Sequence, residues 1–321
     1  SIDKLRLVTA AEYFSSLDEK DQKTLPGAAP ATKETKDKIA VIYAEGDIVS
    51  GEGGDGQMGG DRISEALRKA RLDKKTKAVV LRVNSPGGSA LASDIIWRET
   101  QLIRQAGIPL VVSMGGVAAS GGYYIAAAAD SIFASPNTIT GSIGVFGLVP
   151  YVGDFMKNKL GITVDRVTTG PYADIMSLSR RMRPDERMII QEGVDQVYQE
   201  FVGVVSKGRG LSPDSVHSLA QGRVYTGRQA MALGLVDRMG GLNDALACAA
   251  RMAKLSSYRL RELPEVKDPV EEFIGQLSGA YAEHQSRSEW GPLYRPYQHV
   301  RPWIQNRGIQ ARLEFVPQPL P

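Results

Sequence analysis

The sequence contains one cysteine and three histidines in 321 residues. Cys248 alone cannot close a disulfide within the chain, and it cannot build a cysteine-rich metal site. The 39 basic and 36 acidic residues leave a net charge of only +3, and no basic run is interleaved with aromatic residues. We therefore expect neither a cysteine-based scaffold nor nucleic acid as a partner.

Long apolar runs are also missing. No stretch approaches the roughly 18 consecutive apolar residues that cross a bilayer, and no charged-then-apolar signal sequence opens the chain. The chain starts with Ser1 rather than Met, and Pro26 to Lys36 has the Pro, Ala, Lys and Thr content of a linker. The sequence predicts a soluble fragment of a longer precursor, with residues 1–37 as a linker and the end of a preceding segment.

Strand-like and helix-like segments alternate after this linker. That pattern predicts an α/β fold with largely parallel strands. Strands are expected at residues 38–43, 77–83, 110–113 and 131–134, and helices at 123–129, near Phe155 and from Pro184 onward. From about Glu265 the periodicity is lost, so residues 259–321 are assigned to a C-terminal extension. This extension is either a partly ordered terminus or an arm that grips a neighbouring subunit or the membrane interface.

Three glycine-rich segments lie where strands are expected to end. The first, Gly51 to Gly56, formally contains the G-x-G-x-x-G pattern of dinucleotide sites. Its loop continues through Gly59 and Gly60 before any helix, so no helix N-terminus meets a pyrophosphate. We interpret this segment as a flexible loop beside a cleft.

The second and third segments offer a nucleophile and backbone donors. Asn84 to Ser89 contains adjacent glycines whose N–H groups can face a developing oxyanion, although such a sequence is also an ordinary tight turn. In the third segment, Ser120 stands where a helix begins and is followed by Gly121 and Gly122. Ser120 is then either a helix cap or a nucleophile. Two such turns at successive strand ends favour catalysis, because parallel α/β sheets place their clefts there.

A serine nucleophile requires a base, and the three histidines are poor candidates. His217 lies in a predicted surface helix, and His284 and His299 belong to the C-terminal extension. A desolvated lysine is the usual substitute, because burial lowers its pKa toward neutrality. Lys157 and Lys159 follow a polar helical pattern that is typical of a solvated face.

At this point the motifs resemble those of the signal peptide peptidase A family, over residues 38–258. The similar runs are Leu81–Ser89, Ser113–Tyr124, Thr140–Val145 and Arg223–Asp237. The resemblance implies a Clp-protease and crotonase type of fold and a peptidase domain spanning residues 38–258. It also implies a bacterial inner-membrane protein that faces the periplasm and degrades signal peptides, without any cofactor or metal.

The same resemblance implies the roles of individual residues. Ser120 would be the nucleophile, Gly87 and Gly121 the oxyanion-hole donors, and Ser142 a hydroxyl that orients the lysine base. Short family members place that lysine just before a run similar to Asp174–Ser177, and this chain has Ala173 there. The chain thus resembles the C-terminal half of a double-length member, whose N-terminal half provides the lysine.

The resulting prediction is a serine endopeptidase with a Ser/Lys dyad that cuts extended, mainly apolar peptides. Its lysine would come from the N-terminal half of the same protein or from a neighbouring subunit. We also expect a homo-oligomer and membrane association through a missing N-terminal anchor. The alternatives are a crotonase-type acyl-CoA enzyme, which shares the fold and needs no serine at position 120, and a non-catalytic peptide-binding half.

Overall fold

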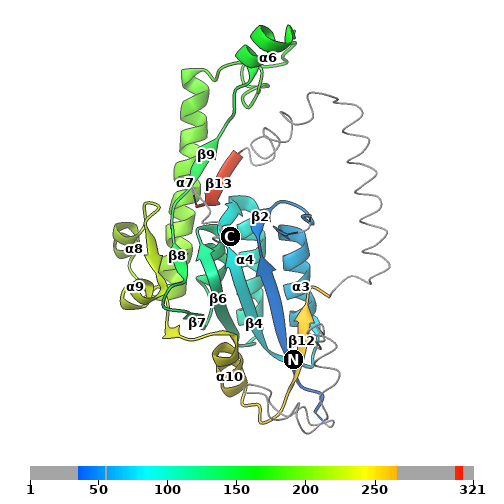
Figure 1. The fold of residues 1–321 in the computed structure, drawn as a ribbon, viewed down its shortest axis with the longest axis vertical. Coiled ribbons are helices and arrows are strands. Elements are labelled where there is room, and N and C mark those ends of the chain that lie inside the picture. The colour runs from blue at the N-terminus through cyan, green and yellow to red at the C-terminus, as the bar shows by residue number, and fades with distance from the viewer. Residues whose placement is uncertain (1–34, 55, 266–307, 314–321) are drawn as a thin grey trace, which may run out of the picture.

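The computed structural model describes residues 35–54, 56–265 and 308–313. Two sheets with flanking helices form the body, and an arm extends from it (Figure 1). The expected α/β class is confirmed. Residues 1–34 of the predicted linker, and 266–307 and 314–321 of the predicted extension, lie outside the described residues.

The larger sheet has eight strands, and most of its neighbours are parallel. Its central path runs in the order β10-β8-β6-β4-β1-β12, and β7 pairs with both β6 and β11. The strands are β1 (Lys38–Glu45), β4 (Thr76–Ser85), β6 (Leu110–Ala119), β7 (Ser131–Ala134), β8 (Ile139–Gly141), β10 (Val224–Thr226), β11 (Arg238–Met239) and β12 (Arg259–Leu263). The predicted extension thus contributes β12, which lies parallel to β1.

Side-chain alternation along the strands builds a core on each face of this sheet. Ala40 and Ile42 of β1 face one cluster, and Ile39 and Val41 face the other. The first cluster includes residues of helices α3 (Gly60–Leu72), α4 (Ala90–Gln105) and α5 (Gly121–Ala126). The second is covered by α10 (Leu242–Met252). Burial on both faces explains why these strands are continuous apolar runs.

The smaller sheet has five short strands in the order β3-β2-β5-β13-β9. They are β2 (Asp47–Val49), β3 (Gln57–Gly59), β5 (Gly87–Ser89), β9 (Phe146–Leu148) and β13 (Gly308–Arg312). The sequence analysis predicted one continuous loop from Gly51 to Gly60, and this prediction is wrong. Strand β3 pairs with β2 before α3 begins.

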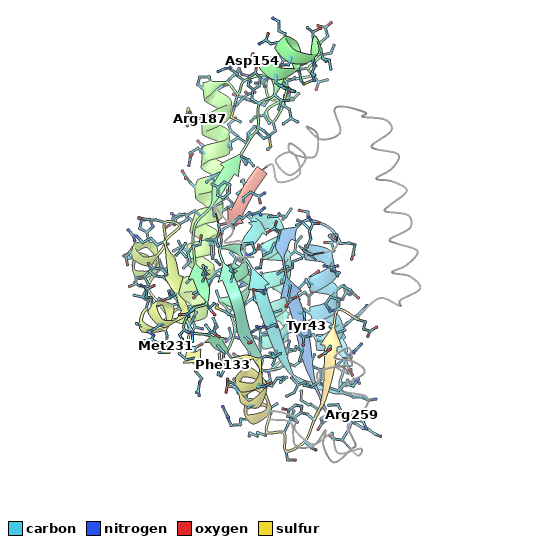
Figure 2. The ribbon with its side chains drawn as sticks, viewed as in Figure 1. Tyr43, Phe133, Asp154, Arg187, Met231 and Arg259 are labelled. Carbon is cyan, nitrogen blue, oxygen red and sulfur yellow. The ribbon has the colours of Figure 1, made fainter. Side chains whose placement is uncertain are left out.

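The arm lies between β9 and the long helix α7 (Pro184–Arg209) and carries the short helix α6 (Gly153–Leu160) (Figure 1). In Figure 2, Asp154 and Arg187 lie at the end of the molecule opposite Arg259. The helices expected near Phe155 and from Pro184 are confirmed. The helix expected at 123–129 instead begins at Gly121 and ends at Ala126.

The remaining described helices are α8 (Pro213–Leu219) and α9 (Gly227–Ala232), which lie beside the larger sheet near β10 (Figure 1). Among the described residues, none of the helices combines the length and the apolar character needed to span a membrane.

Candidate active site

Ser120 joins β6 to α5 in a backbone conformation that is strained for any residue with a side chain. Its φ is 53° and its ψ is −118°. Such angles cost roughly 1–3 kcal/mol and persist where the surrounding structure imposes them, often at functional sites. The Ser120 N–H donates to the Gly141 carbonyl at 2.8 Å, and the Ser120 carbonyl accepts from Tyr124 N at 2.8 Å.

The side chain of Ser120 does not cap the helix. Ser120 occupies the N-cap position of α5 but makes no side-chain cap hydrogen bond. Its Oγ donates instead to the Gly144 carbonyl, at a long distance of 3.4 Å, and the residue is fully buried. The position therefore carries backbone strain without the capping contact that would explain a serine there.

Gly87 and Gly121 lie side by side next to Ser120. A Cβ built on Gly87 would come within 2.8 Å of Gly121 N and 2.2 Å of the Ala311 carbonyl oxygen. Gly87 has a φ of 98°, which disfavours side chains by itself. Its N–H donates to Ser85 Oγ at 3.1 Å in this structure. The two sequence-predicted donors thus share one location, whereas their role as an oxyanion hole remains a prediction.

We expect Gly87→Ala to lower turnover of the assembled enzyme by roughly a hundredfold or more, the cost of one displaced oxyanion donor. The added Cβ would meet backbone atoms on two sides, so the turn must shift. Gly107→Ala is the matched control, since Gly107 has a φ of 72° with no atom within 4 Å of its Cβ position. Steady-state kinetics of both variants measure how much turnover each substitution removes. Equal losses would mean that backbone strain alone is responsible.

Ser142 lies at the same end of the sheet as Ser120. It directly follows Gly141, whose carbonyl binds Ser120 N, and it also has a positive φ, of 48°. Its N–H donates to the Arg223 carbonyl at 2.7 Å. Ser142 lines a cavity of about 540 Å³, whose other lining residues are Gly144, Val145, Phe146, Tyr198, Gln221, Gly222, Val224, Arg312 and Leu313.

No ionisable side chain of the described residues is hydrogen-bonded to Ser120. Lys157 and Lys159 are exposed on α6 in the arm. His217 is exposed on α8, where Nδ1 lies 2.8 Å from Tyr198 Oη and Nε2 lies 3.2 Å from Gln221 Nε2. His284 and His299 lie outside the described residues. The origin of the base outside this chain stays a prediction.

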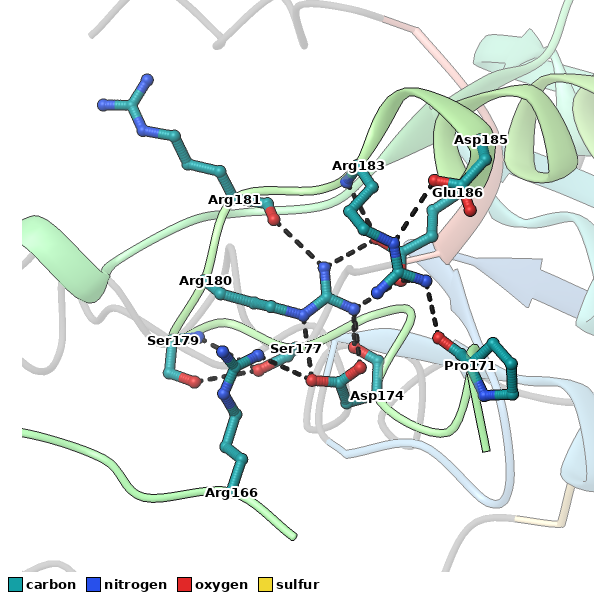
Figure 3. A network of polar contacts seen from close by, with 10 residues as sticks. All are labelled: Arg166, Pro171, Asp174, Ser177, Ser179, Arg180, Arg181, Arg183, Asp185 and Glu186. Atoms are coloured by element: carbon teal, nitrogen blue, oxygen red, sulfur yellow. Dashed lines mark hydrogen bonds and ion pairs between the residues drawn. The ribbon is translucent and has the colours of Figure 1, made fainter. Parts of the chain in front are cut away.

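Ala173 lies in the arm, next to Asp174. Asp174 is tied to the first turn of α7 through Arg180, which binds Asp174 Oδ1 at 2.6 Å and Glu186 Oε2 at 2.6 Å (Figure 3). Glu186 precedes the cavity residue Tyr198 by twelve positions on α7, which is about 18 Å along the helix axis. Ala173 therefore lies near the end of α7 that is remote from the cavity residue Tyr198.

The Arg180 network places two carboxylates around one guanidinium. Glu186 is fully buried, and its carboxylate also accepts from Arg183 N at 2.8 Å. Hydrogen bonds from Arg180 lower the pKa of Glu186 from 4.5 to about 2, and Arg180 lowers the pKa of Asp174 as well. A depressed carboxyl pKa stabilises the fold above the unfolded-state pKa, and this stabilisation is lost as the pH falls toward the folded-state pKa.

We therefore expect the arm to keep its hydrogen-exchange protection from pH 7 to about pH 4.5 and to lose it between pH 4.5 and about pH 2. Glu186→Gln should remove much of this protection at pH 7 and flatten the pH dependence, because Arg180 and Arg183 lose a buried anionic partner. Glu192→Gln, at an exposed position of α7, is the control. If the arm is equally protected from hydrogen exchange in both variants at pH 7, the Glu186 carboxylate does not stabilise the arm.

Sequence analysis missed several residues of the cavity. Tyr198 and Gln221 come from α7 and from the turn after α8, and Arg312 and Leu313 come from the C-terminal extension. The alternation of Ile309, Ala311 and Leu313 is a strand signal that could have indicated β13. Its pairing with β5 and β9 depends on tertiary structure, which no local pattern encodes.

The site therefore combines a buried, strained serine with two glycines at the end of parallel strands. Residues 31–140 match the Clp protease family, and residues 103–256 match peptidase family S49. The chain belongs to peptidase family S49. A relative from Enterococcus faecium, named a candidate signal peptide peptidase, is 38% identical over 256 residues, which is 78% of this chain and 72% of that protein.

Longer relatives are also similar to this chain. Protease 4 of Salmonella typhi is 45% identical over 240 residues, 74% of this chain and 38% of that protein. The chloroplastic serine protease SPPA of Arabidopsis thaliana is 36% identical over 249 residues, 76% of this chain and 36% of that protein. The chain thus spans little more than a third of the length of these relatives.

Proposed function

We propose that this chain is the nucleophile-bearing part of a serine endopeptidase. The observation that carries the proposal is Ser120, held in a strained conformation beside Gly87 and Gly121 without a capping role. The names of the relatives, Protease 4 and serine protease SPPA, agree with this chemistry. No step requires a cofactor.

In the proposed reaction, a neutral lysine takes the proton of Ser120 Oγ as the oxygen attacks the peptide carbonyl. The N–H groups of Gly87 and Gly121 stabilise the resulting oxyanion, and the Ser142 hydroxyl orients the lysine. The C–N bond then breaks, and the lysine returns the proton to the leaving amine. Water hydrolyses the acyl-enzyme ester by the same proton transfers and regenerates Ser120.

We propose that the lysine comes from another segment or subunit. The position of Ala173 in the arm supports this, because the arm extends away from the body that contains β6, the strand before Ser120 (Figure 1). The arm and the first turns of α7 also expose many large apolar side chains, which single soluble chains rarely group together. These are Tyr151, Phe155, Leu160, Ile162, Val164, Val167, Tyr172, Met188 and Ile189.

The proposed substrates are cleaved signal peptides and other extended apolar peptides. Val145, Phe146 and Val224 contribute apolar side chains to the cavity beside Ser142, whose lining also includes the polar residues Gln221 and Arg312. The apolar part of this lining supports the choice. The location proposed for the whole protein is the bacterial inner membrane, with this domain facing the periplasm and assembled as a homo-oligomer. That part of the proposal depends on the resemblance of the motifs to signal peptide peptidase A.

A fluorophosphonate probe tests the proposal most directly. The probe is reacted with the 321-residue chain and with the full-length protein, and the modified residue is located by peptide mapping. We expect an adduct on Ser120, formed much faster in the full-length protein. No adduct on Ser120 in either protein would refute the proposal and would favour an acyl-CoA enzyme of the crotonase type or a peptide-binding half.

A further inference from the structure

The cavity beside Ser142 has a polar wall. Tyr198 of helix α7 and Gln221 of the turn after α8 form this wall. Gly144 lines the same cavity, and its carbonyl accepts from Ser120 Oγ. A group bound in the cavity therefore lies close to the proposed nucleophile, and its polar atoms can meet the side chains of the polar wall.

A series of hydrogen bonds fixes the direction in which Tyr198 can donate. Arg223 Nη2 lies 3.3 Å from Gln221 Oε1, and a guanidinium only donates, so Oε1 is the acceptor. The amide nitrogen of Gln221, which also only donates, lies 3.2 Å from His217 Nε2. Nε2 must therefore accept, and the neutral imidazole carries its proton on Nδ1.

The hydroxyl of Tyr198 is consequently left with a proton to donate. His217 Nδ1 donates to Tyr198 Oη at 2.8 Å, and the two rings pack edge to face with centroids 5.7 Å apart. Among the described residues, the phenol proton itself has no acceptor. Burial raises the pKa of Tyr198, and a hydrogen bond from the main chain of Gln221 opposes this rise only in part. The phenol therefore keeps its proton near neutral pH.

Gln221 is held in a backbone conformation that favours glycine. Its φ is 61°, and glycine would form the same turn with less strain. The side-chain contacts of Gln221 with His217 and Arg223 give the glutamine a role that glycine could not perform. The same turn also holds Ser142, whose N–H donates to the Arg223 carbonyl at 2.7 Å.

We propose that Tyr198 is a specificity-determining residue whose hydroxyl donates a hydrogen bond to a side-chain oxygen of the bound peptide, and that His217 and Gln221 position this hydroxyl. The inference rests on the proposed function, because it takes the cavity beside Ser142 as the binding site of a substrate side chain. The favoured side chain has an apolar stem and a terminal acceptor, as glutamine does. Methionine, of similar length, fits the cavity but cannot accept this hydrogen bond in the same way.

The test measures peptide binding, which does not require turnover. Two fluorescein-labelled peptides, Ala-Ala-Ala-Gln-Ala-Ala-Ala and its methionine analogue, are titrated with the full-length protein carrying Ser120→Ala, and fluorescence anisotropy gives both Kd values. Alanine is too small to fill the cavity, so the central side chain sets the register. We expect Tyr198→Phe to weaken binding of the glutamine peptide roughly fivefold to tenfold relative to the methionine peptide.

The ratio of the two Kd values separates a lost contact from a general defect, because a distorted cavity weakens both peptides. Tyr43→Phe is the matched control. It also removes a phenol hydroxyl, which binds Glu262 on β12, and should leave the ratio unchanged. Circular dichroism shows which variants are folded, and His217→Leu decides the outcome if Tyr198→Phe does not fold.

The positioning residues are tested by the same ratio. His217→Asn retains a donor close to the place of Nδ1 and should keep most of the preference for glutamine, whereas His217→Leu should lose it. Gln221→Gly should not lower the melting temperature, because it removes backbone strain, and yet it should weaken the preference. A merely structural role would leave the preference unchanged in all three variants, which would overturn the positioning role.

An unchanged ratio in the folded Tyr198→Phe protein would overturn the inference, and so would the absence of binding of either peptide when Tyr198 is intact. Fluorophosphonate labelling of the protein with Ser120 intact separates the two proposals. An adduct on Ser120 together with an unchanged ratio refutes the role of Tyr198 alone. A ratio that changes as expected without any adduct refutes the proposed function and keeps Tyr198 as a contact residue of a peptide-binding site.

Discussion

Ser120→Ala is expected to reduce peptide hydrolysis by the full-length protein by roughly four to six orders of magnitude, because the acyl-enzyme can no longer form. Folding should be little affected. Alanine has the same backbone strain at a φ of 53°, and the long hydrogen bond to Gly144 contributes at most about 1 kcal/mol. Turnover of a fluorogenic apolar peptide and denaturant unfolding of the same samples measure the two effects.

Ser120→Gly is the informative companion variant. It removes the nucleophile and also the side chain that makes the backbone strained, so it should be at least as stable as Ser120→Ala. Glycine's greater freedom in the unfolded state offsets part of this gain. Near-normal turnover in either variant would show that Ser120 is structural and that the nucleophile lies elsewhere.

The second large effect concerns the missing base. The unmodified 321-residue chain should be slower than the assembled enzyme by roughly a hundredfold to ten-thousandfold, the usual contribution of a positioned general base. Ala173 is exposed in the arm. A lysine placed there gains a lowered pKa only when a second chain covers it. Activity from Ala173→Lys should therefore rise more steeply than in proportion to protein concentration.

A mixing experiment assigns the base to a second chain. One chain carries Ala173→Lys together with Ser120→Ala, and the other is the unmodified chain, so neither holds both groups. We expect the mixture to exceed the summed activities of its components. Full activity in the unmodified chain alone would mean that a base in this sequence has been overlooked. If the specific activity of the Ala173→Lys chain does not change on dilution, the lysine acts on Ser120 of its own chain.

Much of the body could be predicted because its signals are local. The apolar runs at β1, β4 and β6 are buried on both faces, and the proline and acidic residues at the start of α7 mark a helix N-terminus. The turn at Ser120 could be predicted because Gly121 and Gly122 follow it directly in the sequence. The location of Gly87 near Ser120 could be predicted because the ends of neighbouring parallel strands meet at one edge of the sheet.

What could not be predicted depends on contacts between distant segments. Ser120 is held by Gly141, and the cavity combines residues as far apart as Ser142 and Leu313. The arm position of Ala173 is set by Arg180 and Glu186, whose pairing no hydrophobic period encodes. The roles of Gly87, Gly121 and Ser142 in catalysis stay predictions, because geometry alone places these residues without assigning their chemistry.

Helix α7 connects the arm to the body of the molecule (Figure 1). At one end Glu186 anchors the arm, and fifteen residues later Phe201 packs against Tyr124 of α5, with ring centroids 4.9 Å apart. Tyr124 N is in turn hydrogen-bonded to the Ser120 carbonyl. One continuous helix therefore links the exposed arm to the aromatic side chains beside the turn of Ser120, so a displacement of the arm along this helix would be transmitted toward Ser120.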